Sequence, residues 1–329
     1  MIPKAAPLDA APLLQVRGLT KTFSARRSWS PWWKRKGGLQ DVGALALSAT
    51  PEQVGSRGPA ATRAVDGVSF DLLPGESFGL VGESGSGKTT AVRCILRAIR
   101  PTAGSVRFRL PDHRSVDLAT LPERQLASIR PHVQMIFQDP YSSLNPRMTV
   151  ADIVAEPLRI HRLARGSELE DRVVEMLRRV GLQADHRLRY PHAFSGGQRQ
   201  RIGIARALIM RPSLVVCDEA TSALDVTVQA QVLELLLELQ REFALTYLFV
   251  AHNLEVVHDF CHRVAVMRRG RIVEEAPTEE IFAAPKHPYT RLLLSAAPSL
   301  DPDVPMNFGV GEELARLEGA EGAEGTRGT

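Results

Sequence analysis

The chain has 329 residues, of which 44% are hydrophobic and 24% are charged. This composition suffices for one large domain or two ordinary ones, and it excludes wholesale disorder and collagen-like repeats. No apolar run approaches the length needed to cross a bilayer. Asp9 and Arg17 interrupt the apolar N-terminal stretch, so a signal peptide is not expected. Cys94, Cys217 and Cys261 lie far apart, which is typical of reduced thiols in a cytoplasmic protein.

Charge is distributed unevenly along the chain. The formal net charge is +4, but residues 1–40 carry +7, from eight Lys or Arg and one Asp. Residues 301–329 carry −5, from seven Asp or Glu and two Arg. The pattern favours a basic N-terminal appendage and an acidic, glycine-rich tail on a near-neutral body, rather than a uniformly basic surface that binds nucleic acid.

The first half of the chain predicts strands, one helix and a long insertion. LLQVRGLTKTF (13–23) is typical of a strand, whereas residues 24–62 follow neither helical nor strand periodicity and predict a surface insertion. A helix is expected from 87 to 99, before Pro101. Further strands are predicted at 64–72, 76–82, 106–110 and 132–137.

The second half predicts a group of helices followed by a return to strands. Between 139 and 212, helical apolar spacing recurs at 149–162, 167–180 and 197–210, which indicates an inserted helical subdomain. The continuous apolar run 213–218 is typical of a strand buried on both faces. A helix at 226–243 and strands at 246–251, 262–267 and 271–276 follow. The alternation predicts a mostly parallel α/β core.

Residues 82–89, GESGSGKT, follow a predicted strand and open a predicted helix. They match G-x-x-x-x-G-K-[ST], in which the glycines let backbone N–H groups converge on a phosphate at a helix N-terminus. Lys88 would reach the β- and γ-phosphates and Thr89 would ligate Mg²⁺. The alternative, a Gly/Ser turn with a chance lysine, is disfavoured by the strand–loop–helix context. The nucleotide-binding residues predicted here are Gly82, Glu83, Ser84, Gly85, Ser86, Gly87, Lys88, Thr89 and Thr90.

Two further segments carry candidate nucleotide chemistry. Asp218 and Glu219 end an apolar strand, where Asp218 could hold Mg²⁺ and Glu219 could deprotonate the attacking water; two solvated loop acids are the alternative. FSGGQRQR (194–201) places small residues at a helix start, which could form a second anion site. Ser195 could instead be an ordinary N-cap. A second phosphate site suggests ATP held between two subunits.

The order of these motifs resembles that of ABC transporter ATPase subunits, over roughly residues 13–296. The five matching motifs are GESGSGKT (82–89), Gln138 in MIFQDP, FSGGQ (194–198), CDEATSALD (217–225) and His252 in VAHN. Phe194 replaces the family's usual leucine and keeps an apolar side chain. The resemblance implies a P-loop NTPase (RecA-like) core with an inserted α-helical subdomain at about 139–212 and an antiparallel β edge, together an ABC nucleotide-binding domain over 13–275.

The resemblance also implies roles for single residues. Gln138 would contact Mg²⁺ and the water and relay the state of the site, and Ser195, Gly196, Gly197 and Gln198 would bind the partner's ATP. Asp225 would cross a dimer interface, although it could simply cap the helix at 226–243. His252 would hydrogen-bond the γ-phosphate, although a lone histidine is more often structural. Phe23 would stack on adenine, with a core or turn-packing phenylalanine as the alternative.

Within this family the chain looks most like the oligopeptide/dipeptide importer ATPases, and like the second of their two paired ATPases. Residues 135–158 resemble that group's Q-loop region, and 276–302 resemble its C-terminal extension, with His287, Pro288, Tyr289 and Thr290 at the centre. A helix and turn covering a sheet edge is a compatible interpretation of this extension. Residues 303–329 are expected to form a disordered tail.

The resemblance implies an ATPase that uses ATP and Mg²⁺ to power uptake of peptides or related solutes. Its expected partners are a second ATPase subunit, paralogue or self, in a head-to-tail dimer, two transmembrane permease subunits and, indirectly, an extracellular solute-binding protein. It would sit at the cytoplasmic face of the inner (plasma) membrane and bind no nucleic acid. A soluble ABC ATPase acting on nucleic acid or ribosomes is the alternative, but one motif set without sustained heptads disfavours it. FSGGQ and the D-loop disfavour a small-molecule kinase.

Overall fold

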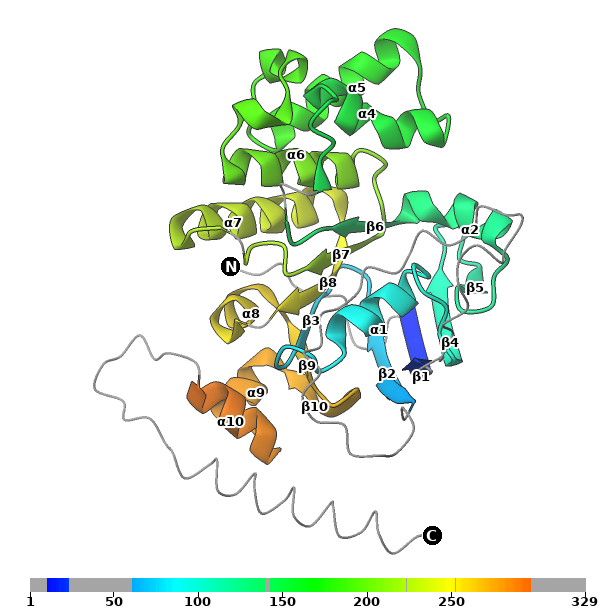
Figure 1. The fold of residues 1–329 in the computed structure, drawn as a ribbon, viewed down its shortest axis with the longest axis vertical. Helices are drawn as coiled ribbons and strands as arrows, with labels where there is room; N and C mark the ends of the chain where they lie inside the picture. The colour runs from blue at the N-terminus through cyan, green and yellow to red at the C-terminus, as the bar shows by residue number, and fades with distance from the viewer. Residues whose placement is uncertain (1–10, 24–60, 140–142, 223, 252, 297–329) are drawn as a thin grey trace, which may run out of the picture.

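The computed structural model describes residues 11–23, 61–139, 143–222, 224–251 and 253–296 (Figure 1). The predicted insertion at 24–62 lies outside these ranges except for its last two residues, and so does the predicted tail at 303–329. None of the helices in these ranges combines the length and apolar character that a bilayer crossing requires.

A six-stranded sheet forms the centre of the molecule, with strand order β10-β9-β3-β8-β7-β6. Five neighbouring strands run parallel and β10 pairs antiparallel with β9 at one edge. This arrangement confirms the mostly parallel α/β core expected from the sequence. The strands are β3 (Ser77–Val81), β6 (Val133–Ile136), β7 (Leu214–Asp218), β8 (Thr246–Ala251), β9 (Arg263–Arg268) and β10 (Arg271–Pro277).

Side chains of the central strands alternate between two hydrophobic cores, one on each face. In β7, Val215 and Cys217 belong to one core and Leu214 and Val216 to the other, all of them fully buried. Helices α7 (Val226–Phe243) and α8 (Leu254–Phe260) cover the first face. Helix α1 (Lys88–Ile95) packs into the core on the second. Burial on both faces explains the continuous apolar run in this strand.

A second sheet is antiparallel, with strand order β2-β1-β4-β5, and lies beside α1 (Figure 1). Phe70 of this sheet stacks on Phe78 of the central sheet, with ring centroids 5.0 Å apart. The expected antiparallel strands therefore comprise the edge strand β10 and this separate four-stranded sheet. Its strands are β1 (Leu14–Phe23), β2 (Thr62–Leu72), β4 (Ala103–Arg109) and β5 (Ser115–Asp117).

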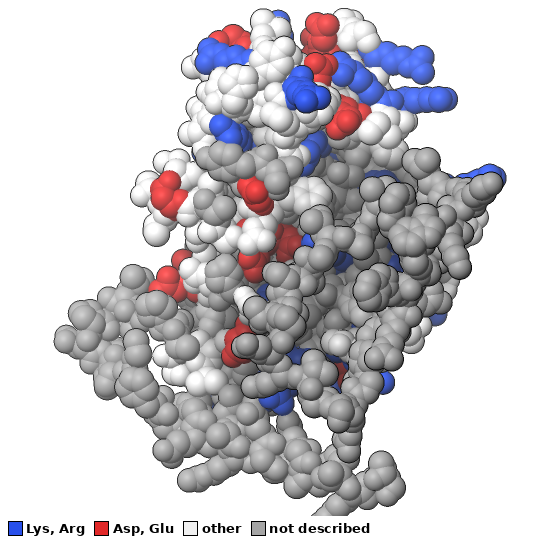
Figure 2. Space-filling model, in the orientation of Figure 1, with Lys and Arg blue, Asp and Glu red and all other residues white. Residues whose placement is uncertain are grey.

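Three helices at the top of Figure 1 follow the predicted apolar spacing: α4 (Val150–Ile160), α5 (Gly166–Arg179) and α6 (Gly196–Leu208). Basic and acidic side chains intermingle on this part of the surface (Figure 2), as in the i,i+4 pairs Arg172–Glu168 and Arg179–Glu175. At the other end, α9 (Thr278–Ala283) and α10 (Pro288–Ala296) follow β10 in the chain. Helix α9 packs against β9 and β10, the edge of the central sheet.

Two details differ from the sequence prediction. The helix expected to reach residue 99 ends at Ile95, because Arg97 adopts a left-handed backbone (φ 54°) and its buried guanidinium donates to the Leu118 carbonyl at 3.0 Å. A tertiary contact thus ends the helix before Pro101 can. The sequence prediction also omitted short elements, namely the three-residue strand β5 and the seven-residue helices α2 (Glu123–Ile129) and α8.

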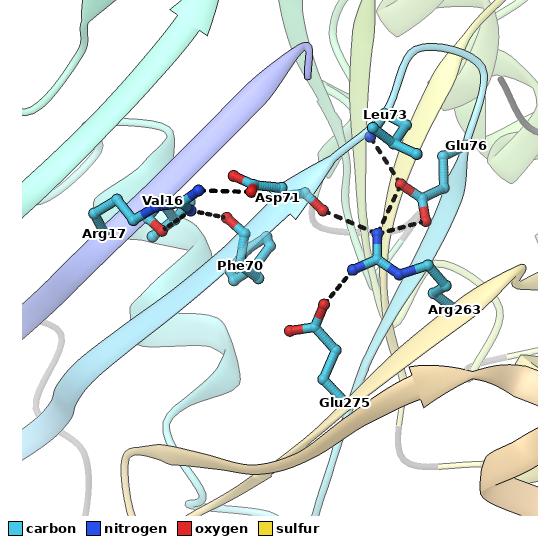
Figure 3. A network of polar contacts seen from close by, with 8 residues as sticks. All are labelled: Val16, Arg17, Phe70, Asp71, Leu73, Glu76, Arg263 and Glu275. Atoms are coloured by element: carbon cyan, nitrogen blue, oxygen red, sulfur yellow. Dashed lines mark hydrogen bonds and ion pairs between the residues drawn. The ribbon is translucent and has the colours of Figure 1, made fainter. Parts of the chain in front are cut away.

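A network of charged side chains ties the two sheets together (Figure 3). The side chain of Glu76 is 1% exposed and accepts hydrogen bonds from Arg263 at 3.0 Å and from the Leu73 amide at 2.8 Å. Arg263 also pairs with Glu275 of β10 and donates to the Asp71 carbonyl of β2. Burial raises the pKa of Glu275, and the charge of Arg263 opposes that shift. One guanidinium therefore joins β2, β9, β10 and the residue just before β3.

We expect Arg263→Met to destabilise the protein by about 3–5 kcal/mol, because it removes the cation from a buried ion pair and leaves Glu76 uncompensated. Urea unfolding monitored by circular dichroism measures the change. Arg114→Met, which breaks the exposed pair of Arg114 with Asp112, serves as the control and should leave the midpoint unchanged. Equal effects of the two substitutions would contradict the role assigned to the network.

Candidate functional site

Several of the predicted site residues meet at one edge of the central sheet. Strands β3, β8, β7 and β6 are neighbours and run parallel, so their carboxyl ends lie side by side. The loop from Gly82 follows β3, Asp218 ends β7, and Gln138 lies two residues after β6. Open α/β sheets form their ligand crevices at this edge. His252 follows β8 but lies outside the described residues.

The phosphate loop sits against backbone from both sheets. A Cβ on Gly82 would lie 2.1 Å from the Met267 carbonyl oxygen, and a Cβ on Gly87 would lie 2.2 Å from that of Ala64. Both glycines also have positive φ, 147° and 105°. These two positions therefore require glycine for space as well as for backbone conformation. The Gly270 amide donates to the Ser86 carbonyl at 2.8 Å and holds the loop to the β9–β10 turn.

Lys88 opens α1 and its side chain folds back over the loop. Its Nζ donates to the carbonyls of Gly82 at 2.6 Å and Glu83 at 2.9 Å. Burial lowers the pKa of Lys88, and the charges of Glu219, Asp218 and Glu83 oppose that shift. Glu83, Ser84 and Gly85 are exposed at the surface of the loop, whereas Ser86 is buried. The ammonium therefore lies along the inner wall of a loop whose outer residues face solvent.

Asp218 and Thr89 form a pair of oxygen donors beside the loop. The Thr89 hydroxyl lies 3.5 Å from the Asp218 carboxylate, and Thr90 next to it is partly buried. Burial, and then the neighbouring charge of Glu219, raises the pKa of Asp218. A divalent cation here would stabilise the ionised carboxylate, and oxygen donors suit Mg²⁺. The described residues contain no cluster of three or more His, Cys, Asp or Glu ligands. Such an ion would therefore complete its shell from water and phosphate, as Mg²⁺ commonly does.

Gln138 and Glu219, which are 81 positions apart, contact each other directly. The Gln138 amide donates to the Glu219 carboxylate at 2.6 Å and lies 3.4 Å from the Ser222 hydroxyl. Glu219 has a left-handed backbone (φ 49°), which is unusual for this residue type, and its amide donates to the Val250 carbonyl of β8 at 2.9 Å. Sequence reasoning treated Gln138 and Glu219 separately and missed Ser222, since no local pattern marks it.

The SGGQ segment begins α6 with a capping box. The Gln198 amide donates to the Ser195 hydroxyl at 3.3 Å, and the Ser195 amide donates to the Gln198 side-chain oxygen at 3.1 Å. Gly196 is the first helical residue, and a Cβ on Gly197 would lie 2.4 Å from the side chain of Val228 in α7. Among the described residues, no hydrogen bond joins this segment to residues 82–90. Ser195 is therefore the N-cap of α6, as the alternative interpretation of this segment expected.

Asp225 and Phe23 lie at the ends of other elements. Asp225 caps α7, because its side chain accepts from the Val228 amide at 3.0 Å. Phe23 ends β1 and is 46% exposed, with Lys21 Nζ 5.1 Å from its ring centroid, so the core alternative for Phe23 is wrong. Its strand partner Thr62 lies two residues before Ala64, which contacts the phosphate loop.

Cavities open beside several of the site residues, among them one of about 160 Å³ lined by Glu219 and Ser222. A cavity of about 600 Å³ opens beside Gln138 and Asp218 and is also lined by the exposed Phe137, with the Arg206 guanidinium 5.8 Å from that ring. A smaller one of about 200 Å³ is lined by residues 83–86, Arg268, Arg269 and Tyr289. Sequence analysis placed Tyr289 in the C-terminal extension but did not anticipate that it would reach the phosphate loop.

Two family models match the chain. The model for ABC transporter matches residues 65–222, and that for the oligopeptide/dipeptide transporter C-terminal region matches residues 273–318. The first match contains the phosphate loop, Gln138, the SGGQ segment and the Asp218–Glu219 pair. The chain therefore carries an ABC transporter ATP-binding domain followed by an oligopeptide/dipeptide transporter C-terminal region.

Curated relatives and solved structures agree with this assignment. The chain is 44% identical over 323 residues to glutathione import ATP-binding protein GsiA of Escherichia coli K12, and 46% identical over 296 residues to that of Pectobacterium atrosepticum. These alignments cover 94% and 90% of this chain but 47% and 43% of the relatives, so the chain spans about half their length.

The fold matches solved ATP-binding cassettes. A dimeric, post-hydrolysis structure of the cassette MJ0796 bound to ADP and Pi is 25% identical, with a TM-score of 0.62 over 80% of this chain and 98% of that one. Clostridium perfringens cbiO1 gives a TM-score of 0.63 at 23% identity over 83% of this chain and 91% of that one. The fold is that of an ABC nucleotide-binding domain, as the sequence motifs indicated.

We expect Gly87→Ala to destabilise the nucleotide-free protein more than Gly85→Ala does. Both substitutions place alanine at positive φ, which costs on the order of 1–2 kcal/mol. Gly85 has open space around its Cβ position, whereas at Gly87 the new methyl group would also meet the Ala64 carbonyl. Thermal unfolding without nucleotide measures both losses. If they are equal, close approach of the two backbones is not what requires glycine at residue 87.

Proposed function

We propose that the chain binds and hydrolyses ATP and powers solute import as a subunit of an ABC transporter. The observation that carries this proposal is the convergence of the phosphate loop, the Thr89–Asp218 oxygen pair and the Gln138–Glu219 pair at one sheet edge. The proposed division of the chain is an ABC nucleotide-binding domain at 13–275, with its helical subdomain at about 139–212, and an importer-type extension at 276–302.

Residues Gly82 to Thr90 would cradle the phosphates with backbone N–H groups and the α1 dipole. Lys88 would donate its remaining ammonium N–H to the β- and γ-phosphates while keeping its bonds to the loop carbonyls. Thr89, Gln138 and Asp218 would hold Mg²⁺, which when bound neutralises charge on the phosphate oxygens. Phe23 would stack on adenine from the end of β1.

Glu219 is the proposed general base. Its carboxylate would accept the proton of the attacking water, which the Gln138 amide, 2.6 Å from that carboxylate, would help to orient. The left-handed backbone of Glu219 and its bond to Val250 support this function, because they fix the carboxylate at the end of β7. His252, at the end of the neighbouring β8, would donate to the γ-phosphate.

The proposed assembly is a head-to-tail dimer with a paralogue or a second copy. Ser195 to Gln198 would complete the site on the partner's phosphate loop, and Asp225 would cross the interface. Two features support this arrangement: the SGGQ segment has no hydrogen bond to the phosphate loop among the described residues, and the MJ0796 cassette with ADP and Pi is itself dimeric.

Two transmembrane permease subunits would couple hydrolysis to import. The cavity beside Gln138 is the proposed contact for a permease segment, because the exposed Phe137 and the hydrolytic Gln138 both line it. The chain would then associate peripherally with the cytoplasmic face of the inner membrane, with a solute-binding protein acting outside. Relatives named for glutathione import support a peptide or a related small solute as cargo.

A non-transport ABC ATPase acting on nucleic acid or ribosomes is the weaker candidate. The matched oligopeptide/dipeptide transporter region favours transport, and the surface of α5 carries paired rather than uniformly basic charges. Co-purification with permeases or with RNA from cells that express the chain discriminates between the two functions.

Glu219→Gln should preserve ATP binding while lowering the hydrolysis rate by about 10²–10⁴-fold, because the amide still accepts from Gln138 but cannot take a proton. Steady-state phosphate release by the assembled complex measures the rate, and a fluorescent ATP analogue measures binding. Glu238→Gln, on the exposed face of α7, is the control. Undiminished hydrolysis would rule out Glu219 as the base.

Ser195→Arg should abolish hydrolysis at the site completed by the partner's phosphate loop, because the long side chain fills the space for the γ-phosphate. ATP binding by the isolated chain should survive. Ser195→Ala removes the same N-cap, worth about 1 kcal/mol, but leaves the space open and should retain far more activity. A parallel loss of binding by the isolated Ser195→Arg protein would indicate misfolding instead.

A further inference from the structure

The C-terminal region reaches the phosphate loop through one tyrosine. Tyr289, the second residue of α10, is 1% exposed, and its hydroxyl oxygen accepts a hydrogen bond from the Glu83 amide at 3.1 Å. Glu83 directly follows Gly82, the first glycine of the loop. A residue 206 positions away therefore contacts the backbone of the loop where it leaves β3.

The bonded amide belongs to the same peptide unit that holds Lys88. The Gly82 carbonyl and the Glu83 N–H are the two polar groups of one peptide, which is planar and trans, so they point in opposite directions. The carbonyl accepts from Lys88 Nζ at 2.6 Å while the N–H donates to Tyr289. A rotation of this peptide would break both bonds. The orientation of the Lys88 acceptor is thus linked to the tyrosine hydroxyl.

The start of α10 is anchored so that the hydroxyl stays in place. The Glu274 carboxylate of β10 accepts from the amides of Lys286 at 2.8 Å and His287 at 3.0 Å, and His287 Nδ1 accepts from the Tyr289 amide at 3.1 Å. The Arg268 guanidinium lies 5.1 Å from the Tyr289 ring centroid. Burial raises the pKa of Tyr289, so the hydroxyl remains neutral near pH 7.

We propose that Tyr289 is a positioning residue of the nucleotide site, acting from the C-terminal region through the Gly82–Glu83 peptide on Lys88. The inference rests on the proposed function, since it assigns ATP to this loop. The hydroxyl fixes the plane of this peptide, and the plane fixes the Gly82 carbonyl that accepts from the Lys88 ammonium. The loop is thereby preorganised before phosphate arrives. The C-terminal helix is in this way part of the nucleotide-binding apparatus.

Tyr289→Phe tests this in the full chain, because it removes the hydroxyl and keeps the ring over which Arg268 lies. Affinity for a fluorescent ATP analogue should fall by about two- to tenfold, the range expected for one hydrogen bond. Tyr247→Phe is the matched control: Tyr247 is fully buried in β8 and donates to the Leu236 carbonyl at 3.0 Å, away from the loop. It should lower the unfolding midpoint without changing ATP affinity. Unchanged affinity in Tyr289→Phe, or an equal loss in both variants, would overturn the proposal.

Two further measurements separate positioning from general stability. In the Lys88→Met background, Tyr289→Phe should cause no additional loss of affinity, whereas losses that multiply independently would exclude action through Lys88.

In nucleotide-free protein, hydrogen–deuterium exchange of the segment with Glu83 should quicken in Tyr289→Phe and not in Tyr247→Phe. This exchange measurement needs no ATP. Unchanged exchange would therefore overturn the inference about Tyr289 without bearing on the proposed function. Failure of the wild-type chain to bind ATP, with faster exchange in Tyr289→Phe, would overturn the proposed function and leave the contact established.

Discussion

Backbone of both sheets closes around the loop from Gly82 to Gly87 at two points where no side chain fits. The Met267 carbonyl of β9 faces Gly82, the Ala64 carbonyl of β2 faces Gly87, and the Gly270 amide binds the loop between them. The loop is thus seated on the parallel sheet and the antiparallel sheet together. Its geometry depends on their relative position, which is why the contacts between the sheets matter for nucleotide chemistry.

The network around Arg263 supports that position from the opposite end of the strands. Arg263 lies near the start of β9, and the same strand ends beside the phosphate loop. Its guanidinium binds Glu76 just before β3, so β3, which leads into the loop, and β9, which packs against the loop, are held together where both strands begin. Buried ion pairs contribute little net stability, but removing one partner is costly. The network therefore acts mainly to specify how the two sheets fit together.

The functional edge of the sheet holds buried charged groups whose burial cost bound ligands would offset. Lys88 is buried against loop carbonyls, with its pKa lowered by burial, while Asp218 is buried beside Glu219 with its pKa raised. Phosphate would compensate the lysine and Mg²⁺ would compensate the aspartate. Each group is thus less stable alone than in the complex that we propose. Tyr289 constrains the loop differently, because its neutral hydroxyl binds a backbone amide and does not pair with a charged side chain.

The sequence by itself determined the strands and long helices, since alternation and helical spacing reflect which faces must be buried. It also determined the glycine loop, Asp218 and Glu219, because their chemistry depends on neighbouring positions in the chain. Short elements such as α8 could not be predicted from the sequence. Helix α1 is shorter than predicted, because Arg97 turns toward Leu118. Only the tertiary structure decided which distant residues touch. The Gln138–Glu219 and Tyr289–Glu83 bonds span 81 and 206 positions. Such contacts leave no periodic signal in the chain, because they arise from strand order and helix packing.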